Sequence, residues 1–174
     1  MERTGLLKAQ LDLTWRFAGE ALDGLTRDEE LWVPSHDSWT VRAGDDGRWV
    51  PDWEEPEPVP PPATSIGWVQ WHVIWWWSTV IDRSFGNGEL RRQDVTWPGP
   101  SRSMEAVDRL RQEWLGHLDA LSEDYLSSAT LTRWPYADDR PFSLVAGWVN
   151  MELMKNVAEM ALIRRITPFY RDRG

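Results

Sequence analysis

The residues best suited to chemistry lie in a helical segment near the C-terminus, at positions 148–160. At about 100° per residue its apolar side chains form one stripe, and Glu152, Asn156 and Glu159 fall within that stripe or on its edge. A buried carboxylate is costly without a partner, so Glu152 needs a cation, a hydrogen-bond network or a wet cleft. The i,i+4 spacing of Glu152 and Asn156 suits a metal pair. It equally suits a polar network that fixes the register of the helix.

A histidine at position 72 is the second candidate. It lies in an apolar segment, with Trp68, Val69 and Trp76 three or four residues away, so an aromatic wall surrounds the imidazole. A lone core histidine is more often structural than a ligand. The interpretation of His72 as a metal ligand gains support from the nearby carboxylates, because an imidazole and carboxylate oxygens together can hold a divalent cation. The other two histidines, His36 in a loop and His117 on the charged side of a helix, are expected to be solvated.

Tryptophan is unusually abundant, with 14 residues in the chain. Five of them fall within ten positions: Trp68, Trp71, Trp75, Trp76 and Trp77. Five indoles cannot share one face, so this helix is apolar nearly all round and is either buried in a bundle or in contact with another subunit. We favour a homodimer through this tryptophan-rich helix over an aromatic ligand cage.

Four segments position these residues. Each has apolar residues at helical spacing. The first and third also carry charged residues on the opposite side, whereas the second is apolar nearly all round. Together the four segments predict an all-α four-helix bundle. The expected helices span residues 6–25, from Thr64 or Ser65 to about 85, from a cap at Ser101 to about 121, and from about 141 to 166, before Pro168.

Residues 26–64 lack this period and contain the proline run 56–62, which predicts a long loop. Within it, residues 40–42 and 48–50 flank an Asp-Asp-Gly turn signal and are able to pair as a short β-hairpin. Loops of this length often cover a site.

Composition limits the function classes. A chain of 174 residues fits one domain, and we expect a single bundle domain over residues 1–174. The formal net charge of −9 argues against nucleic acid as a partner. No cysteine is present, which excludes disulfides and thiolate metal ligands. The N-terminus lacks a signal-peptide core, and the apolar run 66–81 is shorter than the ~20 residues of a membrane span, so we expect a cytoplasmic protein without membrane association.

Motifs for nucleotide binding and hydrolysis are missing from the sequence. It contains no glycine-rich phosphate loop, no Gly-x-Ser-x-Gly and no His-Glu-x-x-His. Kinases, serine hydrolases and zincin proteases are therefore disfavoured, and the sequence identifies no catalytic or organic-cofactor residue.

The order of four segments resembles the DinB-like family. These segments are residues 7–16, residues 47–53 with the proline run after them, residues 68–72 and residues 148–165. The resemblance covers nearly the whole chain. It implies an up-up-down-down or similarly crossed four-helix bundle that is commonly dimeric.

The resemblance also implies a metal site of three histidines, one on the second long helix and an i,i+4 pair on the fourth. His72 matches the first position, whereas Glu152 and Asn156 occupy the other two. An amide is a poor ligand for zinc or nickel, and the altered set favours manganese or magnesium, bound weakly or not at all. Glu159 is the candidate for a replacement third ligand.

Relatives with an intact site resemble metal-dependent enzymes, including thiol transferases in which the metal generates a thiolate. Two interpretations therefore remain open. One is a metal-dependent, thiol-transferase-like enzyme with an altered site for a small-molecule ligand. The other is a non-catalytic dimeric bundle that has lost metal binding and acts as a binding or structural module.

Overall fold

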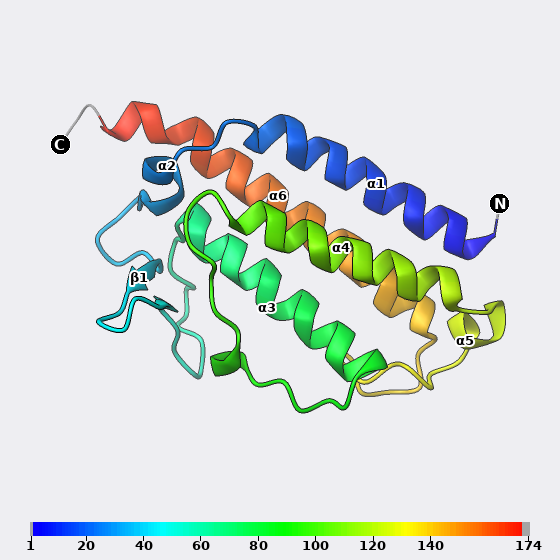
Figure 1. Ribbon diagram of the computed structural model, residues 1–174. Coiled ribbons are helices and arrows are strands. Elements are labelled where there is room, and N and C mark those ends of the chain that lie inside the picture. Colours follow the sequence, from blue (N-terminus) through cyan, green and yellow to red (C-terminus); the bar gives the residue numbers. More distant parts are fainter. Residues whose placement is uncertain (1, 172–174) are drawn as a thin grey trace.

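Four long helices lie side by side and form the bundle that the sequence predicts (Figure 1). The computed structural model describes the backbone of residues 2–171 and the side chains of residues 2–169. The long helices are α1 (Arg3–Leu22), α3 (Ile66–Phe85), α4 (Ser103–Ala120) and α6 (Phe142–Arg171). Two short helices, α2 (Arg27–Leu31) and α5 (Glu123–Ser127), and a 3-10 turn η1 (Arg92–Asp94) lie in the connections.

The directions of the long helices run up, down, down, up. Asn150 Nδ2 donates to the Leu7 carbonyl and Arg164 Nη1 to the Ala21 carbonyl, so α6 is parallel to α1. The rings of Phe85 and Phe142 meet where α3 ends and α6 begins, so these two helices are antiparallel. The parallel pair α3 and α4 is joined by a crossing loop (Figure 1). An up-up-down-down order is therefore wrong for this chain, and the crossed alternative holds.

Most of the predicted apolar stripe of α1 is buried in the core, as Leu7, Leu11, Thr14, Ala18 and Leu22. Leu25, also expected in this stripe, follows the end of α1 and is only partly buried. Helix α3 begins where Ser65 Oγ accepts a hydrogen bond from the Trp68 amide, and it ends at Gly86, as expected. Its side chains are buried around most of its circumference because α4, α6 and the loop before it all cover it.

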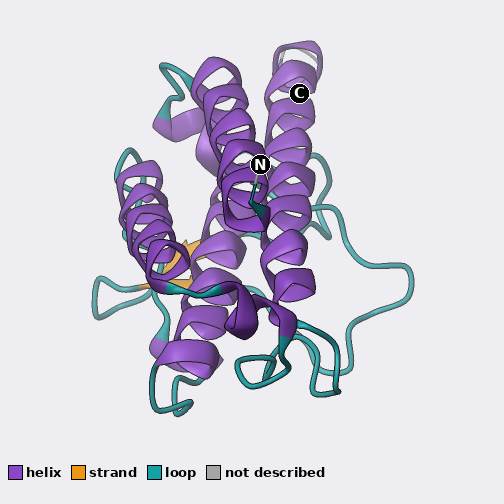
Figure 2. Ribbon diagram, turned by 90° about the vertical axis from the view of Figure 1, so that its right-hand side faces the viewer, coloured by secondary structure: helices purple, strands orange, loops and turns teal. Residues whose placement is uncertain are grey.

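The loop before α3 contains the predicted hairpin. Strand β1 (Val41–Ala43) pairs antiparallel with β2 (Trp49–Pro51), and these two short strands are a small element among loops and helices (Figure 2). Trp53 follows β2 and its ring meets Trp68, Trp71 and Trp75. The indoles of α3 are thus covered by their own chain, so α3 does not supply the exposed rings on which the dimer surface was predicted. The homodimer itself stays a prediction.

Three local expectations were wrong. Ser101 does not cap α4, because it adopts a positive φ of 63° one residue before the actual N-cap, Arg102. Pro168 does not end α6, which continues to Arg171; the proline only removes one amide donor from the last turn. The region 26–64 is not entirely irregular, because Thr26 and Glu29 form a capping box that begins α2.

No helix in residues 2–171 is both long and apolar enough to cross a membrane.

Helix α2 buries a carboxylate. Glu30 is 2% exposed, and its Oε2 accepts a hydrogen bond of 2.9 Å from the Ser101 amide. Burial raises the pKa of Glu30, and the bond from Ser101 offsets that rise only in part. Its neighbour Glu29 is different: burial raises its pKa, but the bonds from Thr26 and Arg164 outweigh burial and leave that pKa lowered.

Neighbouring substitutions on α2 should therefore change stability in opposite directions. A raised pKa means that Glu30 stabilises the fold below its unfolded value of 4.5 and loses this contribution as pH rises through the folded pKa. Glu30→Gln should melt higher than wild type at pH 8, and this advantage should vanish near pH 4. Glu29→Gln should melt lower at pH 8, because a lowered pKa stabilises above the unfolded value. Each effect should be about 2–4 °C, the equivalent of about 1 kcal/mol in a domain of this size. Thermal melts from pH 4 to 8 test both, and shifts of the same sign would contradict this account.

Candidate functional site

The structure brings His72 and Glu152 together across the seam between α3 and α6. His72 Nε2 lies 3.7 Å from Glu152 Oε1. Their side chains are 18% and 16% exposed, so the pair lies at the edge of the core with limited solvent access. Each residue follows the inward stripe of its helix, which explains why the sequence pattern placed them on facing sides.

The cation beside Glu152 comes from its own helix. Lys155 Nζ lies 2.5 Å from Glu152 Oε1, the same oxygen that faces His72. Burial raises the pKa of Glu152, but hydrogen bonds from His72 and Lys155 and the lysine charge outweigh it and leave that pKa lowered. Glu152 is therefore a stable carboxylate held by two partners.

Asn156 lies one turn further along α6 and is bonded to a tryptophan. It is 1% exposed, and its Oδ1 accepts a hydrogen bond of 3.0 Å from Trp76 Nε1. Glu159, in the following turn, accepts a bond of 2.8 Å from Thr64 Oγ1. The three residues of α6 thus face α3 but contact three different residues there or just before it.

The imidazole of His72 is held between indoles. Its ring stacks on Trp68 at 5.1 Å between centroids and meets Trp75 at 5.5 Å. Its Nδ1 is buried and has no hydrogen-bond partner. A proton on Nδ1 would lack an acceptor, so the tautomer that fits carries it on Nε2, directed at Glu152. Neither nitrogen then offers a lone pair to a molecule arriving from solvent.

These residues do not fit the transition-metal site that the family resemblance implies. In the described part of the chain, no group of three or more His, Cys, Asp or Glu side chains is arranged to hold a metal ion. Of the four predicted ligands, His72 and Glu152 contact each other across the seam, and Lys155 already neutralises the carboxylate. A third ligand from Asn156 would require it to give up the bond from Trp76.

Sequence reasoning missed two members of this site. The position of Lys155 on the helix points away from the apolar stripe, yet its long, flexible side chain brings the ammonium back to Glu152, three residues earlier. Trp76 was counted as an apolar side chain, although a buried indole N–H usually finds an acceptor.

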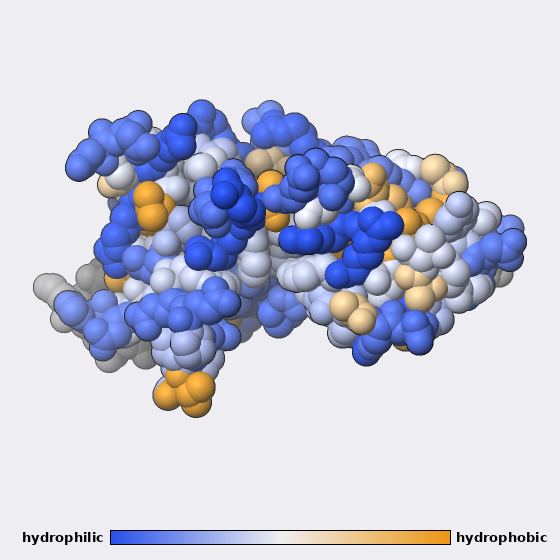
Figure 3. All heavy atoms as spheres, turned by 90° about the horizontal axis from the view of Figure 1, so that it is seen from below, coloured by the Kyte–Doolittle hydropathy of each residue, from blue (hydrophilic) through white to orange (hydrophobic). Residues whose placement is uncertain are grey.

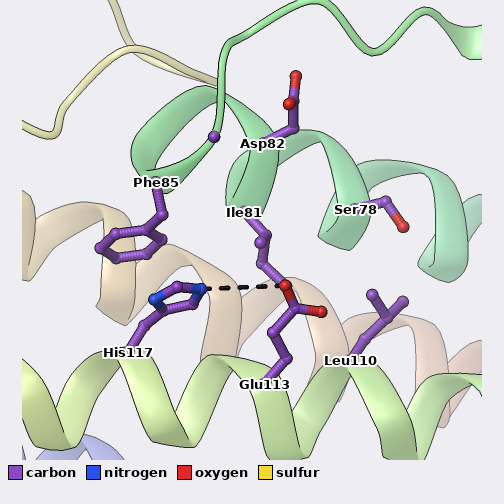
Figure 4. A pocket seen from close by; sticks show the side chains of 8 residues that line it. Ser78, Ile81, Asp82, Phe85, Leu110, Glu113 and His117 are labelled. Atoms are coloured by element: carbon purple, nitrogen blue, oxygen red, sulfur yellow. Dashed lines mark ion pairs between the residues drawn. The ribbon is translucent and has the colours of Figure 1, made fainter.

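Away from this seam, a hollow of about 330 Å³ lies between α3 and α4 (Figure 4). His117 stacks on Phe85 there at 3.9 Å and pairs with Glu113, so this histidine is not simply solvated as expected. Asp82, on the rim, accepts a bond from the Leu90 amide through Oδ2. His36 is fully exposed, as expected. The polar groups of the hollow hold α3, α4 and the connecting loop, and they include none of the predicted ligands.

The Asn156–Trp76 bond should make a measurable contribution to stability. Trp76→Phe removes the donor and leaves a buried amide oxygen unpaired, whereas Trp77→Phe removes an Nε1 that has no partner. Both changes leave a similar cavity in the core, since Trp76 is 1% exposed and Trp77 is fully buried. Trp76→Phe should therefore cost about 1–2 kcal/mol more than Trp77→Phe in urea unfolding. Equal losses would mean that the hydrogen bond contributes nothing beyond packing.

A family model described as the DinB superfamily matches residues 10–160, which is most of the chain. No curated protein and no solved structure gives a significant match. The matched residues run from within α1 to within α6 and include all four long helices, so the match extends over the bundle and the site between α3 and α6. The fold agrees with this result, and the chain belongs to the DinB superfamily.

Proposed function

We propose that this protein is a non-catalytic member of the DinB superfamily that acts as a binding or structural module without a resident transition metal. In this proposal the polar residues between α3 and α6 fix the register of the two helices. The observation that carries it is the contact of Lys155 with Glu152 Oε1, because an ammonium supplies the positive charge that a metal would otherwise bring to this carboxylate.

The hydrogen bonds of the neighbouring residues support a structural role. Asn156 accepts from Trp76, Glu159 accepts from Thr64, and Glu152 contacts both His72 and Lys155. These pairs occupy successive turns of α6, and a shift of α6 by one turn would leave several buried polar groups unpaired. Such a network specifies one alignment of helices that apolar packing alone specifies less strictly.

The metal-dependent, thiol-transferase-like interpretation requires His72 and Glu152 to bind a metal. A bound divalent metal would lower the pKa of a coordinated thiol or water. His72 and Glu152 would have to hold it, after Lys155 leaves the carboxylate and His72 presents the lone pair of Nε2. The contacts of Lys155 and Asn156 favour the structural proposal over this one.

Introducing histidines at the two α6 positions should separate the two interpretations. The wild type should purify with far less than one zinc or nickel ion per chain and should gain little in Tm from added zinc, nickel or manganese. The double variant Glu152→His/Asn156→His, which completes three imidazoles with His72, should bind zinc and melt several degrees higher with it, because ligand at about 100 times its Kd adds about 2.7 kcal/mol.

The control for this experiment is Glu105→His/Arg109→His, an exposed i,i+4 pair on α4. The other histidine of α4, His117, is eight residues beyond Arg109, which is about 12 Å along the helix. This control should bind zinc much more weakly. Elemental analysis and calorimetric melting provide the readouts. Stoichiometric metal in the wild type that is lost in His72→Ala would overturn the proposal and favour the enzyme.

The lysine contact should be visible as a pH-dependent stability. The pKa of Glu152 is lowered, so its pairing stabilises the fold above its unfolded value of 4.5 and is lost as pH falls through the folded pKa. Lys155→Met should lower stability at pH 7 by up to about 1 kcal/mol, and the difference from wild type should shrink toward pH 3. Lys8→Met is the matched control, since Lys8 pairs with the more exposed Asp119 on the surface. Equal effects of the two substitutions would count against a special role for Lys155.

A further inference from the structure

A hollow of about 290 Å³ lies between the β-hairpin and the connection from α3 to α4. One wall comes from residues 46–51, which include β2, and the other from residues 92–96, which include most of η1. Two arginines, Arg48 and Arg92, line it together with the apolar side chains of Trp49, Val50 and Val95. We call it the Arg48/Arg92 hollow.

Buried indoles hold the two walls in place. Trp49 and Trp97 form an antiparallel bridge between the walls, and their rings meet edge to face with centroids 5.0 Å apart. Trp71 Nε1 donates a hydrogen bond of 3.0 Å to the Val95 carbonyl, which ties the second wall to α3. The hollow is therefore formed before any ligand arrives, as is usual for small-molecule sites.

Arg92 is held by stacking rather than by an ion pair. Its guanidinium lies over the ring of Trp53, 4.7 Å from the centroid. Asp94, the carboxylate closest to it in the sequence, instead pairs with Arg91 through two bonds of 2.8 and 2.9 Å. Stacking uses the flat face of a guanidinium and leaves the N–H donors at its edge free. Within residues 2–169, Arg92 is thus an oriented cation without a carboxylate partner.

The other polar side chains of the hollow also have unused donors. Arg48 Nε lies 3.7 Å from Asp46 Oδ2, which is too far for a hydrogen bond. The side chains of Gln93 and Thr96 make no hydrogen bond to another described residue. Two guanidinium groups, an amide and a hydroxyl therefore line one hollow with donors available. Such a set of donors suits the oxygens of an anion.

The charge of the lining favours an anion with a single charge. Arg48 and Arg92 contribute +2 and Asp46 contributes −1, so the formal charge of the lining is +1. A carboxylate matches this charge, whereas a phosphate monoester carries about −1.5 to −2 and would be repelled by Asp46. The net charge of −9 is spread over the whole chain. At physiological ionic strength, exposed charges beyond about 8 Å are largely screened, so the lining dominates.

The size and surroundings of the hollow favour a small molecule over a protein partner. Its volume is close to the lower end of the range of ligand pockets, about 300–1,000 Å³. Both walls lie on the side of the bundle opposite α1 (Figure 1). This side is mostly hydrophilic, and its hydrophobic residues lie in small separate groups (Figure 3). A protein partner would favour a larger apolar patch.

We propose that the Arg48/Arg92 hollow binds a small carboxylic acid as its anion. The two arginines hold the carboxylate, and the apolar body of the acid packs against Trp49 and Val50, of which Val50 is 55% exposed in the free protein. These residues belong to other elements than the polar pairs between α3 and α6. The inference therefore extends the proposed binding role and does not depend on whether a metal binds at that seam.

NMR titration of the full chain at constant ionic strength tests the proposal, with sodium benzoate and isovalerate as probes. At least one acid should shift the amide resonances of Val50 and Thr96 and the Nε resonance of Arg92, and should saturate below about 10 mM. Benzamide keeps the ring of benzoate but lacks the charge, and should bind at least about tenfold more weakly than the acid. Phenyl phosphate should also bind more weakly than benzoate, because of Asp46.

Substitutions in the lining separate the charges. Arg92→Gln should weaken binding of the acid at least about tenfold, and Arg92→Lys should keep part of the affinity, because a lysine retains the charge without the planar stack. Asp46→Asn keeps an oxygen for the Arg48 amide, and it should tighten acid binding and remove the discrimination against phenyl phosphate. Arg109→Gln, on the exposed side of α4, is the control and should change nothing.

Three results would overturn the proposal. The first is that neither acid binds in a saturable way by about 10 mM. The second is binding that Arg92→Gln leaves unchanged, with thermal melts showing that the variant folds. The third is tighter binding of phenyl phosphate than of benzoate to the wild type, which would assign the hollow to a phosphate group instead.

Discussion

Helix α3 has apolar side chains on nearly every side, and covering it is the constraint on which the rest of the structure depends. One helix can cover only part of such a surface. Helix α4 covers one flank, α6 a second, and the segment that precedes α3 folds back with Trp39 and Trp53 over the indoles that remain. The packing of α6 against α3 is also what brings His72 to Glu152.

Polar groups within that packing have to be satisfied locally, because water has little access to the seam. Glu152 and Lys155 are three residues apart on one helix, so the charge of the carboxylate is balanced without any group from outside α6. Asn156 and Glu159 each find one donor across the seam. Pairs of this kind hold α3 and α6 together at the seam. The same pairs make the seam less adaptable, since movement along it separates several bonds at once.

The sequence predicts the parts of this structure that depend on local periodicity. The apolar stripe of α1, the cap at Ser65 and the stop at Gly86 follow from spacing and residue type, and so does the meeting of His72 with Glu152. The errors have physical causes. Ser101 has the right chemistry for a cap but lies in a left-handed turn, where its amide serves Glu30 instead.

Other features depend on contacts between distant segments, which one sequence does not reveal. The indoles of α3 suggested a subunit interface, because a loop without periodicity gives no sign that Trp53 returns to cover them. The role of Lys155 depends on the reach of a long side chain, which a helical projection of Cβ directions leaves out. The order of the helices required tertiary contacts, since α4 follows α3 in parallel only by way of its crossing loop.

The pairing of the first long helix with the last has a consequence for biosynthesis. Helix α1 packs most extensively against α6, and the Leu7 carbonyl meets its partner only at Asn150. Every residue of the intervening chain must leave the ribosome before this contact can form. At a typical elongation rate of about 5–20 residues per second, several seconds pass between the synthesis of α1 and that of α6. During this time the buried side of α1 is not yet packed against α6. The nascent chain thus passes through a stage in which three helices share an incomplete core, and the bundle closes only with the last helix.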